Sequence, residues 1–151
     1  MEIIINELED LKKYIKVKKD KKEIFLEFDD VVFNCSLPNK EIFHYFQEGR
    51  INDYNITIKA RNITFNYGAE CDNIYANNVK SKEILICKLL NAIGDTYGAY
   101  IETEVFVGIN VDANALIVKK IHCKKTKVAF LSIGHEEYFY VQASSVNNIE
   151  V

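Results

Sequence analysis

A repeat of about five residues runs through the sequence from Ile58 to Val128 and limits what the chain can fold into. Each unit has a bulky apolar residue, then any residue, then a smaller residue. The clearest copies begin at Val111, Leu116 and Ile121. Units follow one another every five residues, with one extra residue near Gly68, near Cys87 and near Gly94. This period fits neither the two-residue alternation of a strand nor the helical turn of about 3.6 residues.

The charged residues of this span avoid the repeated positions. Of the 17 charged residues from Lys59 to Lys127, none occupies the bulky or the small position of any unit. Because burying an unpaired charge is costly, this segregation is typical of a structure with an inside and an outside. The bulky and small residues share one face of a short strand, and the other residues form a corner. Asparagine, which suits corners, precedes the bulky residue at Asn62, Asn73, Asn78 and Asn110.

The pattern resembles that of pentapeptide-repeat proteins, whose coils resemble a square tube with four five-residue sides. The usual motif of that family places the small residue two positions before the bulky one, whereas Ile121-His122-Cys123 shows the reverse order. Bactofilins and hexapeptide acyltransferases are similar short-rung solenoids with other periods. The resemblance covers about half of the chain. It implies a β-solenoid in residues 56–130 with four repeat units in each coil.

The flanking segments depart from the repeat. Residues 1–55 predict a small α+β cap, with a short helix around 7–15, a hairpin of strands at 23–28 and 31–35, and a helix from 36 to 49. Residues 131–151 predict a C-terminal β tail, with strands at 129–133 and 138–141 around a turn. The tail either closes the end of the solenoid or pairs with a second copy. The predicted fold is therefore mainly β, a short-rung β-solenoid of about five residues per side between these two segments, in one compact unit.

Composition and charge are those of an ordinary soluble domain. The chain has 151 residues, 48% of them hydrophobic, and a formal net charge of −3. It has no long apolar run, and its first residues lack the features of a signal peptide, so we expect a cytoplasmic protein without membrane association. In that compartment we expect reduced cysteines, with Cys71 and Cys123 facing inward as small hydrophobes. Two disulfides among the four cysteines are the alternative.

The assumed coil of four units predicts which outer residues stack. One outer side then carries Tyr75, Tyr97 and Ile117, and another carries Thr64, Leu85 and Val107. Apolar ladders of this kind are normally covered, so we expect burial by the terminal segments, by a second copy in a homodimer, or by a foreign protein.

A cluster of lysines lies beside these predicted sides, at neighbouring corners. It comprises Lys119, Lys120, Lys124, Lys125 and Lys127. One interpretation is a patch that contacts phosphates, and the other is a solvated rim. The candidate partner surface joins this cluster to the apolar side chains Tyr75, Tyr97, Ile117, Leu85 and Val107.

No motif predicts catalysis, a metal or a cofactor. Within His122-Cys123, neighbours on a strand point to opposite faces, so the pair cannot easily act together. The carboxylates of Glu102 and Glu104 share a convex side without a cleft. The run His135-Glu136-Glu137 lacks the second histidine of a zinc protease motif. An enzyme would need a site assembled from distant residues, with His122 as its candidate.

The leading hypothesis is a non-catalytic protein-interaction module. Small proteins of this design occur on phages and mobile elements, so an inhibitor of a host enzyme that handles nucleic acid is a more specific form, by analogy alone. Direct binding to nucleic acid is disfavoured, because the lysine cluster has neither arginine nor interleaved aromatic residues. The alternative hypothesis is a structural protein that assembles into dimers or filaments.

Overall fold

The structure is a computed structural model that describes residues 1–37 and 54–149, and it is mainly β. Its strands are β1 (Glu2–Ile5), β2 (Ile15–Lys18), β3 (Glu23–Glu27), β4 (Asp30–Phe33), β5 (Asn55–Phe65), β6 (Ala69–Glu70), β7 (Asn73–Ile133), β8 (Glu136–Ala143) and β9 (Val146–Asn147). Two short 3₁₀ helices are η1 (Leu8–Lys13) and η2 (Lys19–Lys21). The strands form a single open sheet within the described ranges. No helix in these ranges is long and apolar enough to span a membrane.

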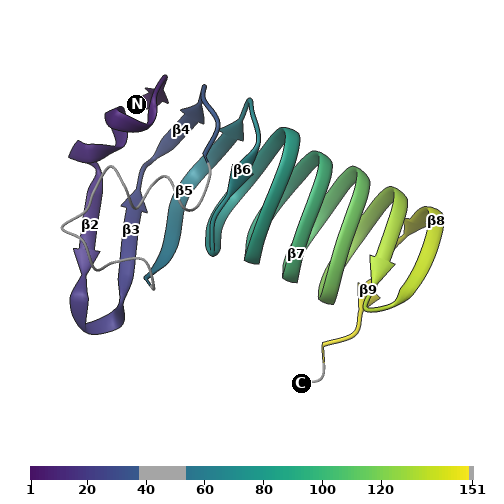
Figure 1. Cartoon of the computed structure of the whole chain (residues 1–151). Helices are drawn as coiled ribbons and strands as arrows, with labels where there is room; N and C mark the ends of the chain where they lie inside the picture. The colour runs from purple at the N-terminus through teal and green to yellow at the C-terminus, as the bar shows by residue number, and fades with distance from the viewer. Residues whose placement is uncertain (38–53, 150–151) are drawn as a thin grey trace.

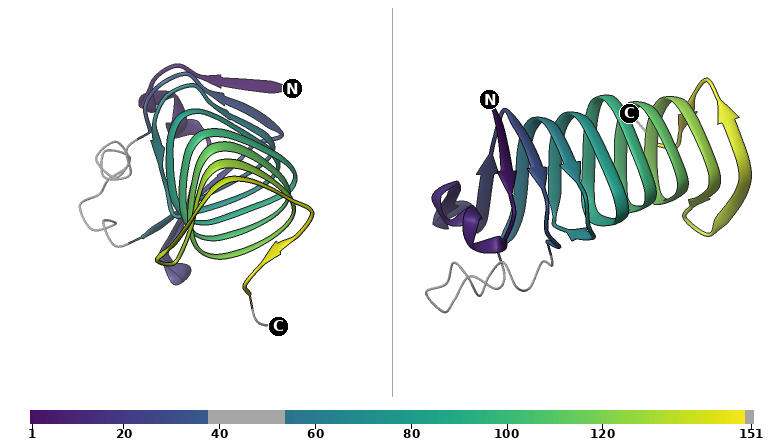
Figure 2. Two further views of the ribbon diagram at one scale, coloured as in Figure 1. Left: turned by 90° about the vertical axis from the view of Figure 1, so that its right-hand side faces the viewer. Right: turned by 90° about the horizontal axis from the view of Figure 1, so that it is seen from above.

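The central part of the chain winds instead of crossing a flat sheet. Strand β7 continues through 61 residues, and Figure 1 shows it passing through successive turns. Viewed along the winding, these turns lie almost on top of one another (Figure 2). Where β5 meets β7, Ile58 faces Ile74, so parallel partners in neighbouring turns have a sequence separation of 16. The same separation joins β6 to β7, where Ala69 faces Leu85.

One turn of the winding takes three units of the sequence repeat, not four. Ile58 begins one unit, and its partner Ile74 begins the third unit after it. The coil of four units, and the stacking of outer residues derived from it, are therefore wrong. Thr64, for example, lies beside Lys80 and not beside Leu85. Three five-residue units do not quite fill the separation of 16, and the extra residues in the sequence make up the difference.

The predicted inward positions form the core. Every bulky position of the repeat is buried except Ile84, which is 51% exposed. The small positions are also buried, apart from Ile86 and Gly98, which are half-buried. Around Ile84 the register is shifted by one residue, because Leu85 and Cys87 are the buried pair. The prediction that Leu85 faces outward is therefore wrong.

The cysteines predicted to face inward do so. Cys71 and Cys123 are buried, together with Cys87, and the described cysteines are free thiols. Burial raises the pKa of the Cys71 thiol well above its usual value and that of Cys87 to about 12. A thiol that stays protonated packs as a small hydrophobe and is a poor nucleophile.

The N-terminal strands extend the same winding. Strands β3 and β4 both pair in parallel with β5, where Leu26 faces Ile58 and Val31 faces Ile63. The predicted hairpin of 23–28 with 31–35 is therefore wrong, and β3 pairs antiparallel with β2 instead. Two strands joined by a short polar segment have the same sequence pattern whether they form a hairpin or continue around a corner. Only the strand with which each of them pairs distinguishes the two cases.

The helical predictions near the N-terminus have two outcomes. The helix expected around 7–15 is confirmed as the 3₁₀ helix η1, with Leu8 and Leu11 buried. The helix expected from 36 to 49 falls, from residue 38 on, outside the described residues.

The C-terminal prediction of two strands around a turn is confirmed. Strand β8 pairs antiparallel with the end of β7, where Phe130 faces Phe139. The turn uses Gly134 at a φ of 63°, a conformation that glycine adopts easily. Strand β9 returns to pair with His122 and Cys123. The hairpin forms the end of the winding opposite the N-terminus (Figures 1 and 2).

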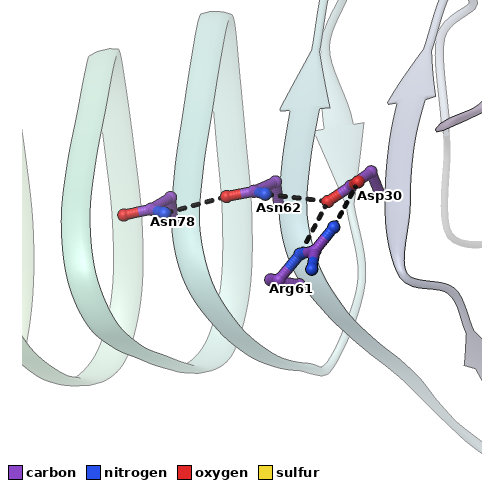
Figure 3. Close-up of polar contacts among 4 residues, drawn as sticks. All are labelled: Asp30, Arg61, Asn62 and Asn78. Carbon is purple, nitrogen blue, oxygen red and sulfur yellow. Dashed lines mark hydrogen bonds and ion pairs between the residues drawn. The ribbon is translucent and has the colours of Figure 1, made fainter. Parts of the chain in front are cut away.

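A row of amide and carboxylate side chains, here called the corner ladder, runs along one corner. It consists of Asp30, Asn62, Asn78, Asp95 and Asn110. Figure 3 shows its first part: Asn62 Nδ2 donates to Asp30 Oδ1 over 2.7 Å, and Asn78 Nδ2 donates to Asn62 Oδ1 over 2.8 Å. The Asp95 N–H then donates to Asn78 Oδ1 over 2.8 Å, and Asn110 Nδ2 donates to Asp95 Oδ1 over 2.7 Å. Each member thus ties its own turn to the next.

A second corner is held by the buried carboxylate of Asp72. Its Oδ2 accepts the backbone N–H of Ile56 over 2.7 Å, and its Oδ1 lies 3.3 Å from Lys88 Nζ. The Asp72 side chain is only 8% exposed. Because Ile56 lies one turn before Asp72 and Lys88 lies one turn after it, this side chain joins three consecutive turns.

Replacing this carboxylate should destabilise the fold. In Asp72→Ala, the buried Ile56 N–H loses its partner and Lys88 loses its counterion. We expect the free energy of unfolding to fall by about 2–4 kcal/mol, measured by urea denaturation. The matched control is Asp112→Ala at an exposed position, which should change it by less than about 0.5 kcal/mol. Equal effects of the two substitutions would contradict this role for Asp72.

Candidate functional site

The structure does not bring the predicted partner-surface residues together on one side. Tyr75 and Tyr97 are exposed, Val107 and Ile117 are half-buried, and Leu85 is fully buried. Tyr75 lies beside Lys59 on one side of the winding. Tyr97 and Ile117 line separate depressions, the first with Lys127 and the second with Glu102. The predicted apolar ladder of Tyr75, Tyr97 and Ile117 is therefore wrong.

The five lysines of the predicted cluster are exposed, and three of them lie near carboxylates. The five are Lys119, Lys120, Lys124, Lys125 and Lys127. Lys119 Nζ is 3.7 Å from Glu104 Oε1. Lys125 and Lys127 line the same depression as Asp95 and Asp112. Acidic neighbours lower the positive potential that a phosphate-binding patch needs.

An open groove beside the corner ladder, here called the corner groove, is the candidate site considered first. Its volume is ≈ 720 Å³, and it crosses several turns. Ala60 and Ala76 lie at its floor, where the small position of two stacked units leaves only a methyl group. Tyr75 and Ile93 border it, and they are 39% and 61% exposed. The groove thus offers apolar side chains to a binding partner.

Two basic side chains of the groove, Arg61 and Lys59, lie close to carboxylates. Arg61 Nε and Nη2 donate to the two carboxylate oxygens of Asp30 over 3.2 and 2.8 Å (Figure 3). Lys59 Nζ lies 4.0 Å from Glu27 Oε2. Hydrogen bonds from Arg61 and then Asn62 hold the pKa of Asp30 below its usual value, and the bond to Asp30 raises the pKa of Arg61. A bidentate pair fixes the plane of the guanidinium group.

The predicted partner surface included Tyr75 of this site but neither Arg61 nor Ile93. Arg61 and Ile93 sit at corners, and their neighbours in space come from other turns. A usable signal was present, because Asp30, Asn62 and Asn78 recur with sequence separations of 32 and 16. The first separation joins the neighbouring strands β4 and β5, the second joins neighbouring turns of β5 and β7, and both identify side chains that stack.

The other candidate groups remain apart. Cys123 is buried and His122 is exposed, as expected for neighbours on a strand. Glu102 Oε1 accepts a hydrogen bond from the Tyr100 hydroxyl over 3.2 Å, and Glu104 pairs with Lys119. No group of three or more potential metal ligands is found within residues 1–37 and 54–149.

Comparison of the chain with models of known protein families, with curated proteins and with solved structures finds no match. The functional interpretation therefore depends on the geometry of the chain itself. The corner groove supplies that geometry, since it combines an apolar floor with charges held in place by pairing.

The pairing of Asp30 predicts a pH dependence of stability. Because the pKa of Asp30 is lower in the folded chain than in the unfolded one, its contribution is present above the unfolded value of about 4 and is lost as the pH falls through the folded value. Asp30→Asn should therefore be less stable than the wild type near neutral pH. The difference should shrink toward zero in acid, as measured by urea denaturation across the pH range. Asp112→Asn serves as the exposed control, and a difference for Asp30→Asn that does not vary with pH would contradict the assignment.

Proposed function

We propose that the chain is a β-solenoid that acts as a non-catalytic module for binding a protein partner. Support for the solenoid comes from parallel partners at a sequence separation of 16 and from the buried repeat positions. Three sides of about five residues, separated by polar corners, account for both. A winding of this kind is held by hydrogen bonds between all its turns, so it presents its outer surface without a large ordering cost on binding.

The corner groove is the observation that carries the binding proposal. Protein interfaces typically have an apolar centre surrounded by a polar rim, and aromatic residues often act as their anchors. Here Tyr75 and Ile93 are exposed beside the floor of Ala60 and Ala76. The Arg61–Asp30 pair lies at the edge of the groove. The partner we expect is a protein that inserts an apolar side chain between Tyr75 and Ile93 and places polar groups against the rim.

The test compares two isoleucine substitutions in the full chain. Ile93→Asp places a charge in the corner groove, whereas Ile84→Asp places one at a similarly exposed position, 51% exposed, outside it. Stoichiometric partners are captured from cells that produce the protein, and their affinity is then measured with purified components. We expect the wild type and Ile84→Asp to bind one common partner, and Ile93→Asp to bind it at least about tenfold more weakly.

Thermal unfolding of both variants controls for loss of fold. If Ile93→Asp binds the same partner with unchanged affinity, the corner groove is not part of the interface. Absence of any stoichiometric partner of the wild type would contradict the function as a whole.

A second candidate function, self-assembly, is favoured by a different observation. The last long strand of the sheet, β8, carries three consecutive exposed aromatic residues, far from the corner groove along the winding (Figure 1).

A further inference from the structure

The C-terminal end of the winding exposes an aromatic strand. Tyr138, Phe139 and Tyr140 in β8 are 42%, 65% and 86% exposed. Within the described residues β8 pairs only with β7, so its outer edge has no strand partner there. Figure 2 shows β8 as the outermost strand at this end. An edge of this kind offers both backbone hydrogen-bonding groups and apolar side chains to another strand.

At the opposite end of the sheet, the edge strand β2 is protected in ways that β8 is not, whereas the other edge strand there, β1, exposes Ile4. Natural sheets block their edges with lysines, with charges or with covering elements. Strand β2 carries Lys16 and Lys18, and the latter also lies 4.2 Å from the centre of the Phe25 ring. Helix η1 contributes buried Leu8 and Leu11 at this same end. Strand β8 has no lysine and no proline, and its two charges lie at its beginning.

We infer that two copies of this chain associate through their β8 edges, tail to tail, about a two-fold axis. Such an axis brings the two β8 strands together antiparallel, and the antiparallel arrangement is slightly the more stable per residue. The interface uses the same surface of both copies, so it closes as a dimer and does not continue into a filament.

The two glutamates of β8 restrict the register of this self-pairing. The segment before the bend at Tyr140, which has a φ of 53°, runs from Glu136 to Phe139. When this segment pairs with itself about its centre, Glu136 faces Phe139 of the partner and Glu137 faces the partner's Tyr138. No glutamate directly opposes a glutamate, an arrangement that would be destabilising. On each face of the new strand pair, Phe139 of one copy lies diagonally across from Tyr138 of the other, and each Phe139 ring already packs against Phe130 of its own chain, with the ring centres 5.4 Å apart.

The experiment measures the mass of the full chain by light scattering after size exclusion, over a wide range of concentrations. We expect the mass to rise from that of the 17.4 kDa monomer toward twice that value. Phe139→Lys introduces an edge lysine and should raise the dissociation constant at least about tenfold. Tyr67→Lys is the matched control, since it changes an aromatic residue that is 46% exposed and lies between β5 and β6, away from β8 along the winding, and it should leave the dissociation constant unchanged.

Each outcome of this experiment either supports or overturns the β8 interface. A wild type that stays monomeric at every concentration, a dimer insensitive to Phe139→Lys, or filaments formed head to tail would each overturn the inference. Should Phe139→Lys fail to fold, amide hydrogen exchange of the wild type decides. Protection of residues 136–139 that grows with concentration supports the β8 interface, and protection that does not grow contradicts it. Binding of a foreign protein at the corner groove is measured separately, so either proposal can fail alone.

Discussion

The constraint on which the structure depends is the pairing of each residue with its counterpart one turn away. Buried backbone groups must find hydrogen-bonding partners, and in this winding the neighbouring turn supplies them. That pairing places Ile58 on Ile74 and Ala60 on Ala76, so the core is built from stacked copies of one position. A slip of one residue would turn these side chains outward. The corner ladder and Asp72 oppose such a slip, because their polar bonds exist in one register only.

The inward positions could be predicted from the sequence because charge segregates locally. The number of units in a turn could not be predicted in the same way, because it depends on contacts between neighbouring turns, whereas a period of five is a local property. The error of one residue in the predicted inward positions around Ile84 has a similar cause. Ile84, Leu85 and Ile86 are all apolar, so hydrophobicity does not show which of them faces inward. The burial of Leu85 is decided by its parallel partner Ala69.

The candidate site was harder to predict than the core for the same reason. Which outer side chains become neighbours depends on the number of repeat units in a turn. The predicted turn was one unit too long, so Tyr75, Tyr97 and Ile117 were wrongly expected to stack on one another. The correct length brings Arg61 to the same groove as Tyr75 and Ile93. Asparagine at corners was recognised from sequence alone, but its function was not visible there. Asn62 both continues the ladder and helps hold the carboxylate that binds Arg61.

The two ends of the winding cover their terminal turns in different ways. A repeating sheet gains its stability from neighbouring turns, so a terminal turn has open backbone groups and an uncovered core. At the N-terminal end the chain uses a 3₁₀ helix and a lysine-bearing strand to cover them. At the C-terminal end it reverses direction, and β8 and β9 pair with the last turn. This reversal satisfies the last turn but creates a new edge, and the side chains on that edge are aromatic. A second identical edge is the simplest cover, because it satisfies the backbone and the aromatic rings together.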